Sequence, residues 1–297
     1  MPTLRDIRRR ITGVANTAKI TQAMRMVSAA KLRRSQEAIQ SARPYVLKMA
    51  EVLKNLVESV GEDYTHPLIQ KHKSVQNVAA IIIASDRGLC GSFNNNLFRY
   101  AMTFLHDKVE TEYPNAKIHV IPVGKRTCLF FKRQKYDVIR EYSGIFAALN
   151  FKYAKEIGNE VVSAFINEEI DKVYIFFNEF KNIMIQRPAT VTLLPIEQTE
   201  VKDASNKNFQ IDYIFEPSEK EILDDLLPKH MDIQIWRTLL ESFASEQAAR
   251  MMAMENATKN ANDLIKHLEL VFNKARQAAI TKEMLEIVSG ADALKKA

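Results

Sequence analysis

The sequence predicts long terminal helices that pair as an antiparallel two-helix coiled coil, with a central doubly wound, Rossmann-like α/β domain. Three observations predict this fold. Only 8 of the 297 residues are glycine, against a usual share of about 7%, and residues 229–289 contain neither glycine nor proline. Apolar residues recur at helical spacing at both ends, and strand and helix patterns alternate in the middle. We expect helices over 1–60 and 211–297 and an α/β domain over 61–210.

The first sixty residues carry helical periodicity in two registers. Leu4–Ala18 and Ile39–Val60 each place apolar residues at alternating steps of three and four, which is the a/d pattern of a coiled coil. The segment Ala15–Ala30 between them consists mostly of polar and small residues, so we interpret it as the place where one register shifts to the other. Pro44 lies inside the second run, where we expect it to bend the helix and not to end it.

The C-terminal part carries a matching pattern. Its predicted seam consists of Met254, Ala257, Ala261, Leu264, Leu268, Val271, Ala275 and Ala278. Half of these residues are alanine, which lets two helix backbones approach closely, and a 3.5-residue repeat implies a left-handed supercoil. The two ends of the chain are therefore expected to pair.

The central region alternates between strand and helix patterns. Asn77–Ser85 is a continuous apolar run typical of a buried parallel strand. The elements expected after it are a helix over Leu97–Val109, a strand over Lys117–Val123, a helix near Arg126–Arg133, a strand over Tyr136–Glu141, a helix over Ala147–Asn167, a strand over Lys172–Phe177 and an edge strand over Ile183–Ile196 interrupted by Pro188. The polar stretch Glu197–Gln210 is expected to be an exposed connection back to the helical part.

Basic charge is concentrated at the N-terminus. Residues 1–60 carry 12 Lys and Arg against 4 Asp and Glu, whereas the other 237 residues carry 30 and 32. Nucleic acid, anionic lipid and an acidic protein would each bind such a segment. No aromatic residue precedes Tyr45, so a platform for stacking bases is missing. An acidic protein partner is the simplest explanation, with a coiled coil that binds nucleic acid as an alternative.

The most conspicuous local motif is Ser85–Asn94, at the end of the first predicted strand. The spacing of Gly88 and Gly91 matches neither a dinucleotide fingerprint nor a P-loop, so we interpret the motif as a structural turn. Cys90 lacks an evident basic partner, because the six histidines are scattered. We therefore predict no catalytic, cofactor-binding or metal-binding residue, although an α/β enzyme with helical arms remains the rival interpretation.

Two further properties bound the class of protein. Two cysteines are too few for a disulfide framework or a cysteine zinc site, which favours a reducing compartment. No apolar run approaches the roughly 18 residues of a membrane helix. The N-terminus lacks the apolar core of a secretory signal, so we expect a cytoplasmic protein.

Several long motifs resemble the gamma subunit family of F-type ATP synthases. They are Arg9–Ile11, Asn16–Arg34, Ser85–Gly91, Ala244–Met254, Asn273–Glu283 and Glu286–Gly290. Two departures are Ser92, where the family usually has a second glycine, and the linker Glu197–Gln210. The cysteine insertion of chloroplast relatives is absent, so thiol regulation of that type is not expected.

The resemblance implies the central shaft of a rotary ATP synthase. The helix pair would lie inside a ring of three alpha and three beta subunits, and the α/β domain beside the epsilon subunit and the membrane c-ring. A single copy would rotate, driven by proton or sodium flow, and couple ion transport to ATP synthesis without binding a nucleotide itself. We expect a peripheral protein on the cytoplasmic face of a bacterial inner membrane.

The resemblance also assigns roles to single residues. Met24 and the bases Arg25, Lys31, Arg33 and Arg34 would face acidic lever loops of the beta subunits, with Arg250 supporting the same region from the opposing helix. The positions that would hydrogen-bond beta-subunit loops are Arg276, Gln277 and Thr281. Leu285, Ile287 and Val288 would lie in an apolar bearing.

Overall fold

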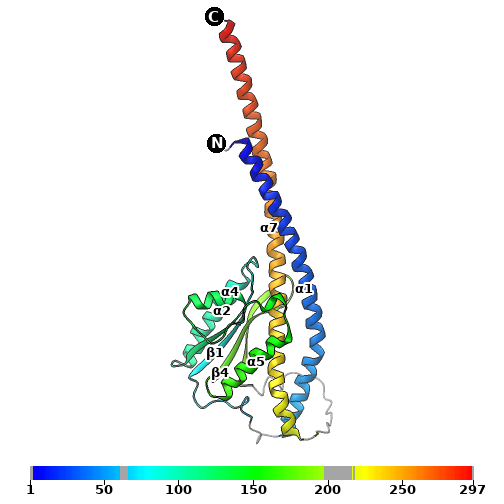
Figure 1. The fold of residues 1–297 in the computed structure, drawn as a ribbon, viewed down its shortest axis with the longest axis vertical. Helices are drawn as coiled ribbons and strands as arrows, with labels where there is room; N and C mark the ends of the chain where they lie inside the picture. The colour runs from blue at the N-terminus through cyan, green and yellow to red at the C-terminus, as the bar shows by residue number, and fades with distance from the viewer. Residues whose placement is uncertain (1–2, 61–65, 197–215, 217, 296–297) are drawn as a thin grey trace. The chain divides into compact units, whose positions relative to one another are not determined.

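The computed structural model describes residues 3–60, 66–196, 216 and 218–295. They form two compact units: Met1–Ser28 with Met251–Ala297, and Ala29–Arg250. Two long helices contribute to both units, α1 (Leu4–Val60) and α7 (Glu219–Lys295) (Figure 1). The predicted fold class, long terminal helices with a central sheet, is confirmed. The predicted division at residues 60 and 210 stays a prediction, and Glu197–Gln210 lies outside the described residues.

Helix α1 has one coiled-coil register, so the predicted shift between two registers is wrong. Steps of three and four continue from Leu4 to Leu56 without a break, because polar residues occupy the middle of the seam. Its buried residues are Ile7, Ala18, Thr21, Ser28, Leu32, Ser35, Met49, Leu53 and Leu56. The Thr21 hydroxyl donates to the Ala18 carbonyl at 3.0 Å, which shows how a buried seam hydroxyl is satisfied within the helix. The helix continues through Pro44.

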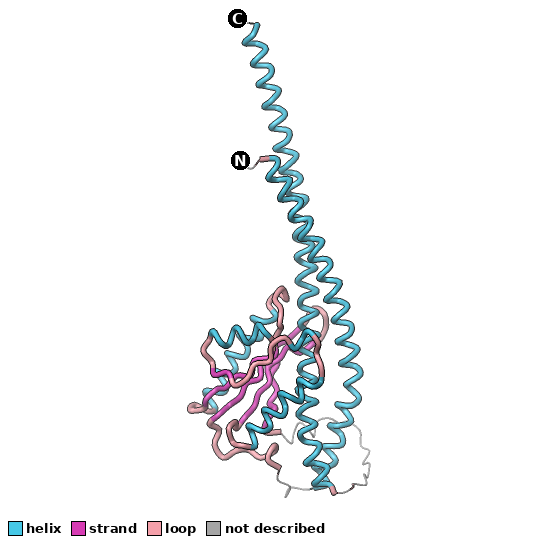
Figure 2. The backbone as a smooth tube through the Cα atoms, in the orientation of Figure 1, coloured by secondary structure: helices cyan, strands magenta, loops and turns pink. Residues whose placement is uncertain are grey.

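In the first unit the start of α1 lies antiparallel beside α7 (Figures 1 and 2). Met254, Ala261 and Leu268 of α7 are buried here, as predicted. The predicted Ala257, Val271 and Ala275 are half-buried, whereas Leu264 is 37% exposed and Ala278 is exposed. Thr258, which the prediction left out, is half-buried, and its hydroxyl lies 2.7 Å from that of Thr21. Hydrophobicity favoured Leu264, but helix geometry turns the following residue toward the partner helix.

The second unit contains a five-stranded sheet in the order β3-β2-β1-β4-β5. The first four strands are parallel and β5 is antiparallel to β4. Their bounds are β1 Asn77–Ile83, β2 Lys117–Val123, β3 Asp137–Val138, β4 Lys172–Phe180 and β5 Gln186–Leu194. The predicted strand over Tyr136–Glu141 shrinks to two residues. Pro188 does not interrupt β5, because an edge strand pairs with only one neighbour.

Helices cover both faces of this sheet. They are α2 Phe93–Phe104, continued by a π-helical turn Leu105–Val109 and by α3 Glu110–Glu112, then α4 Lys125–Arg133, a 3₁₀ turn Ile145–Ala147 and α5 Phe151–Ile166. Helix α5 begins four residues later than predicted, because the side chain of Asn150 caps it by accepting the backbone N–H of Lys152 at 3.0 Å.

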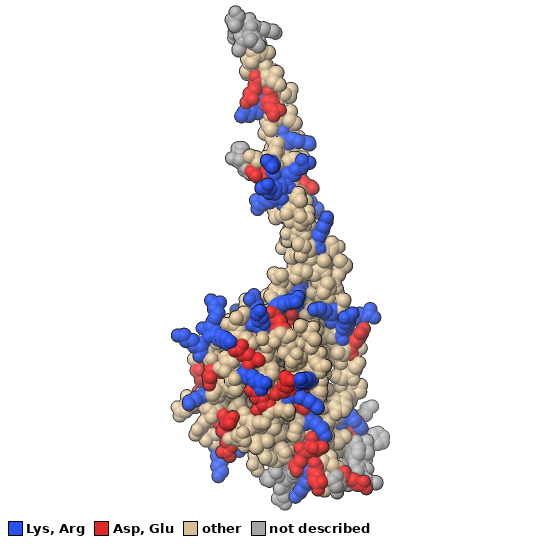
Figure 3. All heavy atoms as spheres, in the orientation of Figure 1, with Lys and Arg blue, Asp and Glu red and all other residues tan. Residues whose placement is uncertain are grey.

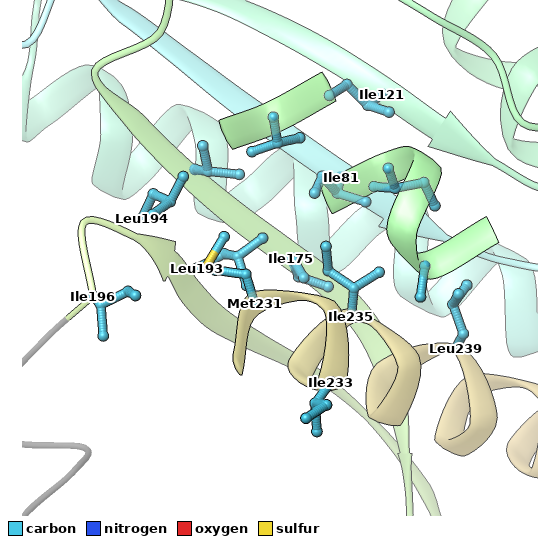
Figure 4. Packing of buried hydrophobic residues seen from close by; sticks show 14 of the residues in the cluster. Ile81, Ile121, Ile175, Leu193, Leu194, Ile196, Met231, Ile233, Ile235 and Leu239 are labelled. Carbon is cyan, nitrogen blue, oxygen red and sulfur yellow. The ribbon is translucent and has the colours of Figure 1, made fainter. Parts of the chain in front are cut away.

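Alternate residues of β1 face two separate cores. Val78, Ala80 and Ile82 pack with α2 and α4, whereas Ala79, Ile81 and Ile83 belong to the cluster that contains α5 and α7. In Figure 4, Met231 and Ile235 of α7 lie beside Ile175 and Ile81 of the sheet. A strand buried on both faces explains why β1 is a continuous apolar run.

Replacing Gly124 by alanine is expected to destabilise the second unit by about 3 kcal/mol or more. Gly124 has φ of +98°, and an added Cβ would lie 2.2 Å from the carbonyl oxygen of Ala84, a fixed backbone atom. The control is Gly144→Ala, because Gly144 also has positive φ (+81°) but an added Cβ meets nothing within 4 Å, so about 1–2 kcal/mol is expected. Urea unfolding followed by fluorescence of the single tryptophan, Trp236, measures both. Equal losses would contradict the steric argument.

His230 on α7 is expected to make the fold acid-sensitive. Burial lowers its pKa to about 4, below the usual 6.5. The folded chain therefore binds this proton less readily than the unfolded chain, so the stabilisation is complete above pH 6.5 and falls as the pH drops toward 4, by at most about 3 kcal/mol. His230→Gln should flatten the pH dependence of the unfolding free energy in this window. Identical pH profiles for wild type and His230→Gln would contradict this prediction.

Candidate functional site

Helix α7 occupies the place where doubly wound sheets usually bind ligands. In the observed strand order the direction of winding changes between β1 and β4, and the crevice at the carboxyl ends of these strands is the common ligand site. Two buried serines of α7 fill it. Ser242 Oγ donates to the Ile83 carbonyl at 3.0 Å, and Ser245 Oγ donates to the Asn178 carbonyl at 2.9 Å. This crevice is therefore closed by the chain itself.

A buried ion pair joins α7 to the Ser85–Gly91 turn. Arg250 Nη2 lies 2.7 Å from Glu246 Oε1 and donates to the carbonyls of Arg87 at 3.0 Å and Gly88 at 3.3 Å. Burial raises the pKa of Glu246, and the guanidinium of Arg250 counteracts that shift. Arg250 is only 8% exposed, so its visible role is to fix the turn, and its contact with a beta subunit stays a prediction.

Asp86 is a structural residue that the sequence analysis missed. Its carboxylate accepts the backbone N–H groups of Lys125 at 2.9 Å, Gly144 at 2.8 Å and Phe146 at 3.0 Å. It thereby links the turn after β1 to the start of α4 and to the loop after β3. Two signals were available, its position directly after a buried strand and its place in the Ser85–Gly91 motif, but its partners lie 39 to 60 residues away.

The turn offers no activated nucleophile among the described residues. Cys90 is buried, burial raises the pKa of its thiol, and Asn94 Nδ2 donates to its sulfur at 3.3 Å. The other thiol, Cys128, has a pKa raised to about 11, again mainly by burial. A buried thiol that stays protonated is a poor nucleophile. No group of three or more His, Cys, Asp or Glu able to hold a metal ion occurs in the described part of the chain.

The N-terminal part of α1 carries exposed and largely unpaired basic charge (Figure 3). Lys31, Arg33 and Arg34 are exposed, and Met24 and Arg25 are half-buried on the same helix. Of the nine bases in the first 34 residues, Arg33 alone forms an ion pair in the described regions, at 3.1 Å to Glu37. Such a surface favours an acidic partner.

The end of α7 extends beyond the start of α1 within the first unit (Figure 1). Arg276, Gln277 and Thr281 are exposed there, and the Thr281 hydroxyl donates to the Gln277 carbonyl of its own helix at 2.9 Å. Four large apolar residues follow on the bare helix: Met284 is 61%, Leu285 62%, Ile287 71% and Val288 57% exposed. Neighbouring apolar residues exposed in this way indicate a contact surface.

None of the described helices combines the length and the apolar character that a bilayer crossing requires.

The predicted partner-contact residues fall into three groups. The first group lies on α1 and consists of Met24, Arg25, Lys31, Arg33 and Arg34. The second group lies at the end of α7 and consists of the predicted hydrogen-bonding residues Arg276, Gln277 and Thr281 and the predicted apolar bearing residues Leu285, Ile287 and Val288. Arg250 stands apart because it is buried against the turn.

The comparisons with known proteins agree on one family. The family model described as ATP synthase matches residues 3–294. The ATP synthase gamma chain of Chlorobium phaeobacteroides is 46% identical over 295 residues, 99% of this chain and 100% of that relative, and that of Chlorobaculum tepidum is 44% identical over the full length of both.

A solved structure of the Euglena gracilis mitochondrial ATP synthase, comprising OSCP, F1 and c-ring, contains a chain of the same fold. Its TM-score is 0.67 at 22% identity, covering 98% of this chain and 94% of that chain. The family model matches residues 3–294, and the similarity to the Chlorobium phaeobacteroides relative extends over almost the entire length of both sequences. This chain therefore belongs to the family of ATP synthase gamma chains.

Proposed function

We propose that this chain is the central rotating shaft of an F-type ATP synthase, which transmits torque between the membrane c-ring and three catalytic beta subunits. The observation that supports this most directly is the helix pair of the first unit. Its buried seam holds the two helices together, and the outward residues leave a basic and an apolar surface for other subunits.

The shaft would act through differential contacts and perform no chemistry itself. A ligand or partner shifts a conformational equilibrium only by the difference in its affinity for the two states. A turning shaft that presents the basic side of α1 to one beta subunit and other surfaces to the rest would bias their nucleotide affinities in turn. Helix α7 suits this role, because residues 229–289 contain no glycine or proline that would let it yield.

The proposed partners are three alpha and three beta subunits around the helix pair, and the epsilon subunit and the c-ring beside the α/β region. Met24, Arg25, Lys31, Arg33 and Arg34 would meet acidic loops of the beta subunits, with Arg250 keeping the adjoining turn in place. We call Arg276, Gln277 and Thr281 the latch residues: they would form hydrogen bonds with loops of the beta subunits, and these bonds would form and break at each step of rotation. Leu285, Ile287 and Val288 would fill an apolar bearing. We propose a peripheral position on the cytoplasmic face of the membrane.

Met24→Lys is expected to impair coupling between proton transport and ATP turnover. The added ammonium would bind an acidic loop of a beta subunit too tightly, and a surface charge pair of about 1 kcal/mol would slow release roughly fivefold. Membrane vesicles that contain the complex provide the measurement, as ATP-driven proton pumping divided by ATP hydrolysis. The control is Met26→Lys, which adds the same charge at a more exposed position of α1. If Met24→Lys showed the wild-type ratio of proton pumping to ATP hydrolysis, the proposed contact of Met24 with an acidic loop of a beta subunit would be contradicted.

Gln277→Leu is expected to lower steady ATP turnover of the assembled complex roughly fivefold, the value of one hydrogen bond of about 1 kcal/mol. The isolated chain should keep its stability, since Gln277 is exposed and its side chain has no partner among the described residues. The control is Asn262→Leu, a similar change at an exposed position of the same helix. Unchanged turnover in Gln277→Leu, or equal losses in both variants, would refute the latch.

A further inference from the structure

The packing of α1 against α7 is incomplete in one stretch of the second unit. Ser35 and Met49 of α1 are buried, but the seam residues between them, Ile39, Ala42 and Val46, are only half-buried. A cavity of about 370 Å³ lies along this stretch, and within the described chain it is lined by residues of α1 and α7 only. The seam therefore contains a space that neither helix fills.

The walls of this cavity are mostly apolar. Val46 and Leu47 of α1 lie in its lining together with Trp236 and Leu240 of α7. Leu47 is 53% exposed, and Trp236 is only half-buried although it is the one tryptophan of the chain. Apolar surface that stays accessible beside an otherwise packed seam gains free energy when an apolar molecule covers it.

The size of the cavity favours a small molecule over a protein segment. Sites for small ligands commonly enclose about 300–1,000 Å³. A single helical turn about 10 Å wide and 5.4 Å long occupies roughly 400 Å³. The cavity of about 370 Å³ thus has room for a small ligand but not for one turn of a partner helix.

The charged residues of the cavity leave one positive charge over. Its lining contains two arginines and one glutamate. Arg237 Nε lies 2.8 Å from Glu241 Oε1, so these two charges are paired. Arg43 is exposed and forms neither a hydrogen bond nor an ion pair with the described residues. A free guanidinium beside an apolar cavity favours a ligand with a single carboxylate.

A neighbouring cavity of about 440 Å³ shares Trp236 with the first but suits an anion less well. Its two lysines already have partners: Lys229 Nζ lies 2.9 Å from Asp225 Oδ2, and Lys155 Nζ lies 5.7 Å from the centre of an aromatic ring. Asp232 also lines this cavity and would repel a carboxylate. The first cavity is therefore the better site for an anion.

We propose that the first cavity binds a small amphipathic carboxylate. Its aliphatic chain packs against Trp236 and Leu47, and its carboxylate pairs with Arg43. The bound chain fills the space between the half-buried seam residues, so the ligand contacts both helices at once and stabilises their packing.

Quenching by 8-bromooctanoate tests the proposal in the isolated full-length chain, because bromine quenches tryptophan near contact and Trp236 is the only tryptophan. Saturable quenching is expected. The neutral 8-bromooctanol should bind about fivefold more weakly, since it lacks the half-exposed charge pair. The shorter 6-bromohexanoate should bind about fifteenfold more weakly, because two fewer methylene groups are buried. Absence of saturable quenching, or equal affinity for the acid and the alcohol, would overturn the proposal.

Two matched pairs of variants locate the bound molecule. Arg43→Gln should weaken binding about fivefold, whereas Lys155→Gln in the neighbouring cavity should leave it unchanged. Leu47→Ser should weaken binding at least threefold, whereas Tyr45→Ser, a similarly exposed position that lines only the neighbouring cavity, should not. The reverse ranking in either pair would place the ligand in the other cavity and contradict the proposal. All four side chains are exposed, so these variants should fold, and the isolated chain makes the result independent of the proposed function.

Discussion

The packing of α7 across the carboxyl edge of the sheet is the constraint on which the second unit depends. Ser242 and Ser245 use their hydroxyls to satisfy carbonyls at the ends of β1 and β4, where the ladder no longer supplies partners. The fully buried Ala244 and Ala248 leave room for the helix to approach. A larger residue at either position would push α7 away and leave buried carbonyls unpaired.

The buried pair of Glu246 and Arg250 follows from the same packing. A buried charge pair contributes little net stability by itself, but removal of one partner strands the other charge. Here the guanidinium also satisfies the carbonyls of Arg87 and Gly88, so the pair fixes the path of the turn. Asp86 extends this network to α4. In this doubly wound sheet, the crevice that usually binds a ligand is therefore occupied by α7, which is rigidly attached there.

The sequence predicted the elements well and the polar interactions poorly. The local pattern of apolar residues was enough to predict β2 (Lys117–Val123), the buried strand β1 and the coiled-coil seam over Ile39–Leu56. The middle of the α1 seam was missed because Thr21, Ser28 and Ser35 are polar residues that are nevertheless buried. The hydroxyls of Thr21 and Ser35 donate to the carbonyls of Ala18 and Leu240 in the folded chain. The roles of Asp86 and Arg250 depend on partners 39 to 163 residues away, a separation that periodicity cannot reveal.

The folded chain leaves several interactions incomplete in the described residues, and they differ in kind. Of the nine bases at the start of α1, only Arg33 has an ion-pair partner among the described residues, and the end of α7 is exposed apolar surface. Each is unfavourable or neutral for the isolated chain, since apolar exposure forfeits about 25 cal/mol per Å² and like charges repel. Their persistence on otherwise well-packed elements is best explained by contacts in an assembly. The difference in chemistry further implies that separate partner surfaces meet these two regions, with α1 suited to transient electrostatic contacts and the bare end of α7 to a continuous apolar one.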